Sequence, residues 1–515
     1  MVAGTELAGY IHSWKSSRTI HFPLHKDFSM KLHNPLIRWL TASLLLCCSS
    51  VASADVKLAS IFGNSMVLQQ GMSVPVWGWA EAGEKVTVTF ADQTQQATAD
   101  KDGRWQVKLD SLTANAKGQP LKVSGQNTVT LSDVLVGEVW ICSGQSNMEW
   151  SVNASMNAKE EIAGADHPQI RLFNVPGHTT SPVAKDTCPG AWQICQPQSI
   201  RGFSAVGYFF GRRLQKTLNV PIGLVGSNWG GTRIEPWTSP AGFQSVPELK
   251  NLADQVGQYT ETTKVGGGSP SAIYNAMVHP LAPFAMRGAI WYQGESNGGE
   301  GESYYHKTQA LVNGWRQLFN PDLAFYWVQL ANFRAPNENP EGGDGWARIR
   351  EAQRKALGIK HTGMAVIIDI GEARDIHPRN KQDVGSRLAQ WALHQTYDKQ
   401  ALVPSGPLYK SHKVEGDAVR VSFDHVGDGL IVGKKEGLAP TQQVADGKLA
   451  RFAVAGADKK WFWAEATIDG NDVIVKSSEV KSPVAVRYAY SMNPLGANLY
   501  NKQGLPASPF RTDDW

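Results

Sequence analysis

The sequence predicts an α/β protein in which a parallel sheet with helices on both faces is flanked in the chain by N-terminal and C-terminal β-rich modules. From about Val134 to about Tyr397, strand-like apolar runs alternate with longer amphipathic stretches, which indicates strands and helices in turn. On either side, short alternating runs are interrupted by Gly, Asp and Asn, as in antiparallel β modules. A chain of 515 residues is also too long for one ordinary core.

Residues 1–54 are expected to lie outside the folded protein. From Met30 the chain has a basic start with Lys31 and Arg38, an apolar run at 40–48 and a small-residue exit that ends at Ala54, which is the layout of a secretory signal peptide. We therefore expect residues 1–29 to be an over-called start and the protein to be periplasmic or secreted. The apolar run is far shorter than the roughly 20 residues that span a bilayer, so we expect no permanent membrane anchor.

Charge and cysteine content narrow the function classes. Without residues 1–54 the chain has 45 basic and 44 acidic residues, a net charge of +1, which gives no electrostatic reason to bind nucleic acid or an acidic membrane. No cysteine pair has zinc-like spacing with histidines. In an oxidising compartment Cys188 and Cys195 could close a small disulfide loop, and Cys142, in an apolar strand, is expected to be a buried thiol.

The elements of each part can be placed in order. Residues 55–133 are predicted to form a β-sandwich without any cluster of titratable residues, with strands at 74–80, 85–91, 103–109 and 127–133. Residues 134–400 are predicted to be the catalytic domain, with strands at 134–142, 222–229, 288–293, 324–330 and 364–370 and helices at 203–218, 271–284, 305–319 and 346–358. In such a parallel sheet, sites gather beyond the carboxyl ends of the strands. Residues 401–515 are predicted to form the second β module.

Ser146 lies in the stretch GEVWICSGQSNMEW, directly after the strand-like run VWIC. A serine between a strand and a helix start is lifted out of the sheet, and the free N–H groups of the helix point toward developing negative charge. A nucleophile needs that geometry. A serine in a polar turn is also a common helix cap, and the GxSxG elbow is absent because Met148 replaces its second Gly.

Asp375 and His377 stand two residues apart after the apolar strand at 364–370. A serine hydroxyl becomes a nucleophile when a histidine accepts its proton and a carboxylate stabilises the imidazolium. Beyond a strand end, both side chains could face the pocket of Ser146. On their own, Asp375 could instead cap a turn and His377 could simply precede Pro378.

Small and amide residues follow two further strand ends. Gly230 and Gly231 lie in SNWGGTRIEPW, and Gln293 and Asn297 lie in WYQGESN. Acyl transfer needs donors aimed at the tetrahedral oxyanion, and one such donor is typically worth about 3 to 4 kcal/mol of barrier. A glycine N–H or a side-chain amide can supply it, although singly these segments are a turn and a loop.

The motifs GQSNM, NWGGT, WYQGESN and DIHP, in this order, make the middle segment resemble the sialate O-acetylesterase family within the SGNH (GDSL-like) hydrolases. The flanking β modules also fit the bacterial members of that family. The resemblance implies an SGNH-hydrolase-like (flavodoxin-like) sheet. It also implies a secreted serine esterase that removes O-acetyl groups from carbohydrates through an acetyl-serine intermediate, with no metal or organic cofactor.

The resemblance also assigns roles by position. Ser146 would be the nucleophile, His377 the general base and acid, and Asp375 the residue that orients the histidine. The Ser146 N–H, a glycine of the pair Gly230 and Gly231, and a side chain of WYQGESN would form the oxyanion hole.

This chain departs from the wider superfamily in two of these roles. There an Asn supplies the amide, and the Asp stands three residues before the His. We therefore prefer Gln293 for the amide, with Asn297 as the alternative, and the carboxylate stays open to Glu372 or Asp369.

Two other functions fit part of the sequence. A glycoside hydrolase would need two carboxylates about 5 to 10 Å apart, and nothing pairs the available Glu149, Glu235 and Glu295. A non-catalytic carbohydrate-binding protein would use aromatic faces, and five tryptophans crowd the motifs, namely Trp140, Trp150, Trp229, Trp237 and Trp291. Most of these are expected in the core or pocket wall.

The substrate stays open between O-acetylated sialic acid and acetylated plant hemicellulose. A sialic acid carboxylate would suit a cation such as Arg233 or Arg374 near the pocket, although an arginine is as often a structural ion-pair partner. Oligomeric state and the role of each β module stay open as well.

Overall fold

The computed structural model describes residues 55–515, and the signal peptide and chain start predicted within residues 1–54 lie outside them. In the described range, no helix combines the length and apolar character needed to cross a membrane. Nor do three or more His, Cys, Asp or Glu side chains gather within residues 55–515 as a metal site would require.

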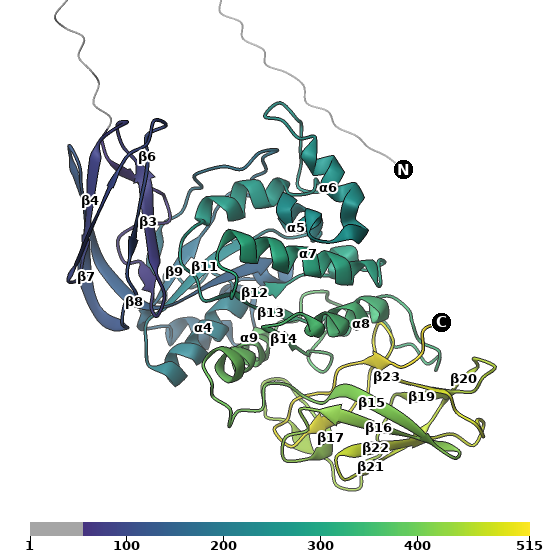
Figure 1. Cartoon of the computed structure of the whole chain (residues 1–515). Helices are drawn as coiled ribbons and strands as arrows, with labels where there is room; N and C mark the ends of the chain where they lie inside the picture. The colour runs from purple at the N-terminus through teal and green to yellow at the C-terminus, as the bar shows by residue number, and fades with distance from the viewer. Residues whose placement is uncertain (1–54) are drawn as a thin grey trace, which may run out of the picture. The chain divides into compact units, whose positions relative to one another are not determined.

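Strands make up the N-terminal part of the described chain, drawn in purple and dark blue in Figure 1. Their bounds are β1 (Lys57–Leu58), β2 (Val67–Gln69), β3 (Val74–Trp79), β4 (Lys85–Phe90), β5 (Gln93–Thr98), β6 (Arg104–Leu109) and β7 (Asn115–Ser124). β1, β3 and β6 form one antiparallel sheet, and β4 pairs with β5 and β7. Apolar and polar residues alternate in β4 and β6, and only the apolar ones are buried, which is why these segments form strands.

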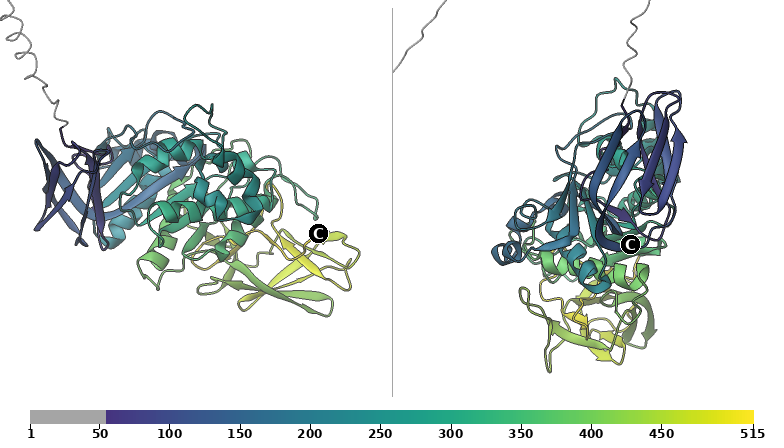
Figure 2. Two further views of the ribbon diagram at one scale, coloured as in Figure 1. Left: turned by 45° about the horizontal axis from the view of Figure 1, so that its top comes forward. Right: turned by 90° about the vertical axis from the view of Figure 1, so that its left-hand side faces the viewer.

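One long strand, β8 (Thr128–Gly144), connects the N-terminal strands to the central sheet. Its first half pairs antiparallel with β7, and its second half lies parallel to two strands of the central sheet. Asp133, at an irregularity in the pairing with β7, has a φ of 56° and its carboxylate binds Arg171 at 2.6 Å. The boundary predicted between residues 133 and 134 therefore falls inside a continuous strand, which can be followed in the left view of Figure 2.

The central sheet is mixed and has the order β10-β9-β11-β8-β12-β13-β14. The strands other than β8 are β9 (His167–Asn174), β10 (Trp192–Cys195), β11 (Ile222–Asn228), β12 (Gly288–Tyr292), β13 (Ala324–Val328) and β14 (Thr362–Ala365). All neighbours from β9 to β14 run parallel, and β10 at the edge is antiparallel. β11, β12 and β13 are buried along their whole length, as expected of parallel strands covered on both faces.

Helices cover both faces of this sheet (Figure 1). On one face Trp140 of β8 packs edge-on against Phe210 of α4 (Ala205–Leu218), and α9 (Lys381–Trp391) packs beside α4. On the other face Trp315 of α7 (Ser303–Leu318) packs against Trp291 of β12 and Phe325 of β13. The remaining helices are α2 (Ser146–Glu149), α3 (Ala158–Ala163), α5 (Pro240–Gln244), α6 (Lys250–Gly257) and α8 (Ala347–Lys355).

Two predicted elements of the central part are wrong in extent. The strand expected at 364–370 ends at Ala365, because the chain turns there and Arg387 takes both the Val366 carbonyl and the Asp369 carboxylate. The helix expected at 271–284 is a π-helical turn, Tyr274–Val278, followed by a 3-10 turn, His279–Leu281. Pro280 cannot donate a helical hydrogen bond, so the regular helix cannot continue.

The C-terminal part is also made of strands, drawn in green and yellow in Figure 1. Its sheets have the orders β15-β16-β22-β21, β18-β17-β24 and β20-β19-β23-β25. The strands are β15 (Leu408–Glu415), β16 (Ala418–Asp424), β17 (Leu430–Lys434), β18 (Gln442–Gln443), β19 (Phe452–Ala455), β20 (Trp461–Trp463), β21 (Glu465–Asp469), β22 (Asp472–Lys476), β23 (Ala485–Tyr488), β24 (Leu499–Asn501) and β25 (Phe510–Arg511). Arg350 of α8, fully buried, donates to the carbonyls of Ser491 and Met492, which fixes this part against the central one.

Candidate active site

The motifs of the sequence analysis converge at one edge of the central sheet. β8, β11 and β12 are in register at their carboxyl ends, because Asn228 and Tyr292 are both partners of Gly144. A Cβ on Gly144 would lie 2.1 Å from the Tyr292 carbonyl oxygen, so only glycine lets β8 end this close to β12. Ser146 then begins the short helix α2. The GQSNM, NWGGT and WYQGESN segments therefore meet beyond this edge.

Ser146 and His377 are in direct contact. The Ser146 Oγ lies 2.9 Å from the His377 Nε2. The Asp375 Oδ1 accepts the His377 backbone N–H at 2.9 Å and lies 3.5 Å from the His377 Nδ1, which is longer than a good hydrogen bond. The imidazole ring stacks on Trp150 at 4.7 Å and 15°. These contacts give a serine, a histidine and a carboxylate in the order that nucleophilic catalysis requires.

The two alternative carboxylates have other partners. The Asp369 carboxylate is buried and bonds to both terminal nitrogens of Arg387 at 2.6 and 2.8 Å. The Glu372 Oε1 accepts the Arg379 backbone N–H at 2.9 Å. Of the three candidates, Asp375 has the contact with the imidazole.

Gly230 lies against the serine, and Gly231 follows it with a φ of 74°, a left-handed conformation that glycine adopts without strain. A Cβ on Gly230 would stand 3.2 Å from the Ser146 Cβ. The Gly230 N–H donates to the Glu149 Oε2 at 2.7 Å, so in this structure a carboxylate oxygen occupies that donor.

Gln293 and Asn297 are both buried and hold the loops together from the inside. The Gln293 Nε2 donates to the Asn297 Oδ1 at 2.8 Å, to the Thr232 carbonyl at 3.1 Å and to the Gln145 Oε1 at 3.2 Å. The Asn297 Nδ2 donates to Glu235 and Glu300. Within residues 55–515, the hydrogen bonds of both amides thus run to the surrounding loops and not to the Ser146 side chain.

A buried chain of polar groups that the sequence analysis missed lies beside the serine and the histidine. The Asn147 Nδ2 donates to the Glu295 Oε1 at 2.6 Å and to the Ile376 carbonyl at 3.0 Å. The Asn147 Oδ1 accepts from the Lys381 Nζ at 2.5 Å. The available signal was a lysine in the run HPRNK, four residues after His377.

Burial and these charges shift the ionisation of the site. Burial and the charge of Lys381 lower the pKa of His377, against the raising effect of Asp375. Burial lowers the pKa of Lys381 from 10.5 to about 7, although Glu295, Glu372 and Asp375 oppose it. Burial raises the pKa of Glu295, which the bond from Asn147 and the charge of Lys381 only partly offset. A His377 with a lowered pKa is neutral, and so able to accept a proton, over a wider pH range.

A cavity of about 790 Å³ adjoins the site. Glu295 and Ile376 line it on the site side, and Phe333 and Trp346 stack at 5.3 Å and 20° in its wall. This volume lies within the range of about 300 to 1,000 Å³ typical of small-molecule sites, so the cavity can hold part of a substrate beside Ser146.

The other carboxylates and cations that the sequence offered are engaged elsewhere. The Glu149 Oε1 lies 2.7 Å from the His178 Nε2, and the half-buried Glu295 accepts a hydrogen bond from Asn147. Burial alone would raise the pKa of Glu235, but bonds from Lys307 and Asn297 hold it below its usual value. Arg233 pairs with Glu235 and Glu300, and Arg374 is exposed. Each of the three glutamates thus has polar partners of its own.

The expected disulfide between Cys188 and Cys195 is wrong. Both are free, buried thiols in the structure, as is Cys142. Cys195 ends β10 opposite His167, whereas Cys188 lies in the segment before β10, where its carbonyl accepts the Ser60 hydroxyl. Burial raises the pKa of the Cys188 and Cys195 thiols to about 11 and about 12.

Comparisons with known proteins agree with this geometry. Residues 136–394 match the family model described as SASA, a carbohydrate esterase, sialic acid-specific acetylesterase. The sialate O-acetylesterase of Homo sapiens is 32% identical, over 92% of this chain and 96% of its own length, and that of Pongo abelii is 30% identical with the same coverage. A carbohydrate acetylesterase structure from Xanthomonas citri is 39% identical, with a TM-score of 0.79 over 90% of this chain and 100% of its own.

The fold, the site and these matches define an esterase. The family follows from the extent of the matches: the chain belongs to the sialic acid-specific acetylesterase family of carbohydrate esterases.

Proposed function

We propose that the protein removes O-acetyl groups from carbohydrates through an acetyl-serine intermediate. The observation that carries the proposal is the contact of 2.9 Å between the Ser146 Oγ and the His377 Nε2. Ser146 Oγ attacks the acetyl carbonyl carbon while its proton passes to His377. The bond from the acetyl carbon to the sugar oxygen then breaks, and that oxygen takes the proton from His377. Water, deprotonated by His377, then attacks the acetyl-serine. The bond from the acetyl carbon to the Ser146 Oγ breaks, the Ser146 Oγ takes the proton back from His377, and acetate leaves.

The negative charge of the tetrahedral intermediate needs donors at the serine turn. The Ser146 N–H, at the start of α2, and the Gly231 N–H are the proposed donors, with the Gly230 N–H joining them once it leaves the Glu149 carboxylate. Gln293 and Asn297 stay the proposed amide candidates of the hole. The bonds of Gln293 to Gln145 and Thr232, and the bond from the Ile234 N–H to the Asn297 Oδ1, support a role in positioning its backbone. Asp375 is the proposed carboxylate partner of His377.

The arrangement of the sheet supports an SGNH-hydrolase-like fold. With the edge pair β9 and β10 left out, the order β11-β8-β12-β13-β14 is the 2-1-3-4-5 order of flavodoxin-like sheets. The proposed nucleophile, Ser146, follows β8, and the proposed base, His377, follows β14. The signal-peptide-like stretch at 30–54 supports export to the periplasm or the medium.

The substrate is proposed to be an O-acetylated glycan, either sialic acid or a hemicellulose. The human and orangutan relatives are named for sialate, and the Xanthomonas citri protein for carbohydrate acetyl groups in general. The adjoining cavity holds a stacked aromatic pair together with Arg334 and Arg348, so it offers both an apolar wall for a sugar ring and cations for a carboxylate.

Acetate release tests the proposal. The protein is incubated with O-acetylated sialic acid, acetylated xylan and acetylated xyloglucan beside Ser146→Ala and His377→Ala. We expect each variant to lose at least about a thousandfold in turnover with an unchanged circular dichroism spectrum. Ser143→Ala and His412→Ala are matched controls, because the buried Ser143 Oγ has no partner within residues 55–515 and His412 contacts Tyr409 in the C-terminal part. Normal turnover in Ser146→Ala would contradict the mechanism, and glycan binding without any acetate release would favour a binding protein.

A further inference from the structure

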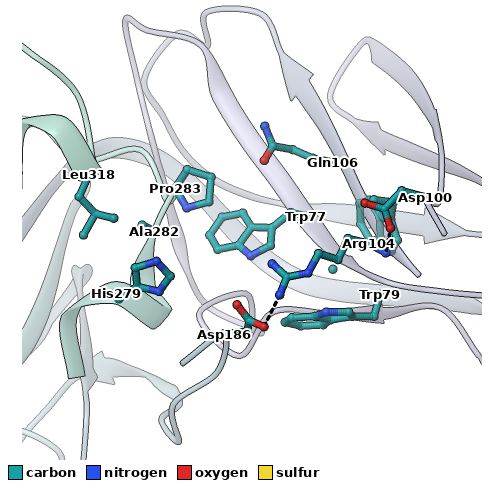
Figure 3. A pocket seen from close by; sticks show the side chains of 12 residues that line it. Trp77, Trp79, Asp100, Arg104, Gln106, Asp186, His279, Ala282, Pro283 and Leu318 are labelled. Carbon is teal, nitrogen blue, oxygen red and sulfur yellow. Dashed lines mark hydrogen bonds and ion pairs between the residues drawn. The ribbon is translucent and has the colours of Figure 1, made fainter. Parts of the chain in front are cut away.

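A second cavity, of about 460 Å³, lies between the N-terminal strands and the central part (Figure 3). Its side chains include Trp77, Trp79, Arg104, Gln106, Asp186 and His279. Pro283 and Leu318 also line it, just before β12 and β13 begin. The cavity is therefore at the amino ends of the parallel strands, whereas Ser146 follows the carboxyl end of β8, and the two cavities share no lining residue.

The strand register places four of these side chains on one face. β3 and β6 are antiparallel, and Trp77 is opposite Gln106 while Trp79 is opposite Arg104. Because side chains alternate between faces, these four residues point the same way and the buried Trp105 points the other way. In an antiparallel sheet, the face that does not pack on the core is usually polar. Two tryptophans on that face therefore need an explanation.

Packing explains one of the two tryptophans. Trp77 is buried and makes an edge contact with Phe62 at 4.7 Å, and Phe62 in turn contacts Phe284. Trp77 therefore belongs to the contact between the N-terminal strands and the central part. Trp79 is only partly buried, and Figure 3 shows its ring below Arg104 on the cavity side.

The polar side chains around Trp79 could form hydrogen bonds with the hydroxyl groups of a ligand. Arg104 and Asp186 form an ion pair at 2.5 Å across the cavity rim, with 57% and 42% of their side chains exposed. The Gln106 amide is exposed beside Trp77. Aromatic rings accept the C–H face of a sugar ring, and a carboxylate, a guanidinium and an amide on the rim bind its hydroxyls, so the set matches a pyranose unit.

The charges of the lining exclude an acidic sugar. Asp100 and Asp186 bring two carboxylates, and the one guanidinium, Arg104, is already paired with Asp186. The His279 Nδ1 lies 2.9 Å from the Lys185 carbonyl oxygen, so that ring nitrogen is engaged with the chain. A sialic acid carboxylate would meet like charges here, whereas a neutral sugar would not.

We propose that this cavity binds a neutral sugar unit of a glycan chain, through Trp79 with Arg104, Asp186 and Gln106. The choice of a glycan as ligand rests in part on the proposed function. A site at the far end of the sheet from Ser146 holds a polymer near the enzyme without taking part in ester cleavage.

Affinity electrophoresis of the full chain in gels with deacetylated xyloglucan, deacetylated xylan or polysialic acid tests this. Deacetylated probes carry no ester for the serine site. We expect at least one neutral polymer to retard the protein and polysialic acid to leave it unretarded. Trp79→Ala and Asp186→Ala should each weaken binding about tenfold, a change of about 1.4 kcal/mol. Trp515→Ala is the matched control, since Trp515 is 39% exposed and lies outside this cavity, and its affinity should stay within about twofold.

Hydrolysis of 4-nitrophenyl acetate by the same proteins separates this proposal from the esterase mechanism, and it should be equal in all of them. Retardation of Trp79→Ala equal to that of the unaltered protein would overturn the sugar site, as would a protein that no neutral polymer retards or that polysialic acid retards best. Loss of ester hydrolysis in the unaltered protein would instead contradict the serine mechanism and leave the binding result standing.

Discussion

The burial of Lys381 predicts that the free energy of unfolding of the protein depends on pH. The side chain is completely buried, and burial lowers its pKa from 10.5 to about 7 against the opposing charges of Glu295, Glu372 and Asp375. Below pH 7 the folded and the unfolded chain both carry the Lys381 proton, so the full cost of the buried charge is present. Between pH 7 and pH 10.5 only the unfolded chain keeps the proton, and the free energy of unfolding rises with pH.

The size of the effect follows from the same two values. Each pH unit in this window is worth at most about 1.4 kcal/mol. Over the interval from about 7 to 10.5 the Lys381 contribution therefore reaches about 5 kcal/mol. Removing the ammonium group with Lys381→Met should abolish this rise. Lys381→Gln is the second variant, because it removes the charge but keeps an N–H donor on the side chain that faces the Asn147 Oδ1.

Urea unfolding at pH 6, 7, 8 and 9 measures the prediction as the difference between the unaltered protein and each variant. That difference should move in favour of the unaltered protein by about 1.4 kcal/mol per unit above pH 7. Lys435→Met is the matched control, since Lys435 is also buried but forms an ion pair with Asp383 at 2.7 Å. A difference that is constant between pH 6 and pH 9 would refute the lowered pKa of Lys381.

Three further predictions concern the site and the cysteines. The acidic limb of kcat/KM should fall below pH 6.5 in the unaltered protein, because His377 acts in its neutral form and its pKa is lowered, and Lys381→Met should move that limb to higher pH. Asp375→Asn should lower kcat by about 10⁴-fold in a folded protein, and Glu372→Gln should keep most activity. Asp369→Asn should instead destabilise the fold by about 3 to 5 kcal/mol, because Arg387 loses its buried partner. A loss of activity in Glu372→Gln without unfolding would reassign the carboxylate role to Glu372. Mass spectrometry after alkylation under denaturing conditions should find Cys142, Cys188 and Cys195 all modified without prior reduction, and a pair that reacts only after reduction would restore the disulfide.

Much of the fold could be predicted because its strands have strong periodic signals. Mainly apolar runs mark β11, β12 and β13, and alternating runs mark β4 and β6. The residues at which strands begin and end were harder to predict, because they depend on contacts with residues distant in the sequence. The strand at 364–370 ends early through Arg387, eighteen residues after Asp369. The sequence also gives no sign that β8 continues through residues 133 and 134, since its two halves have different partners.

Some features of the site could also be expected from the sequence, and others could not. The proximity of Ser146 and His377 could be expected, because a known chemistry uses these residue types after strand ends, and their side chains are in contact; the catalytic roles of Ser146, Asp375 and His377 stay predictions. The buried chain of Glu295, Asn147 and Lys381 could not be expected, because its members come from three segments and only folding brings them together. The engagement of the Gly230 N–H with Glu149 is also a property of the folded turn alone.

Asn147 connects these observations. It follows the proposed nucleophile directly, and its Nδ2 binds the carbonyl of Ile376, the residue before the proposed base. The same side chain binds Glu295 on the loop after β12 and Lys381 at the start of α9. One amide thus fixes the serine turn to the histidine loop and holds a buried cation close enough to depress the pKa of His377. Burial of the imidazole and this charge both lower the pKa of His377, so the contacts that hold the histidine loop also help to keep the proposed base neutral.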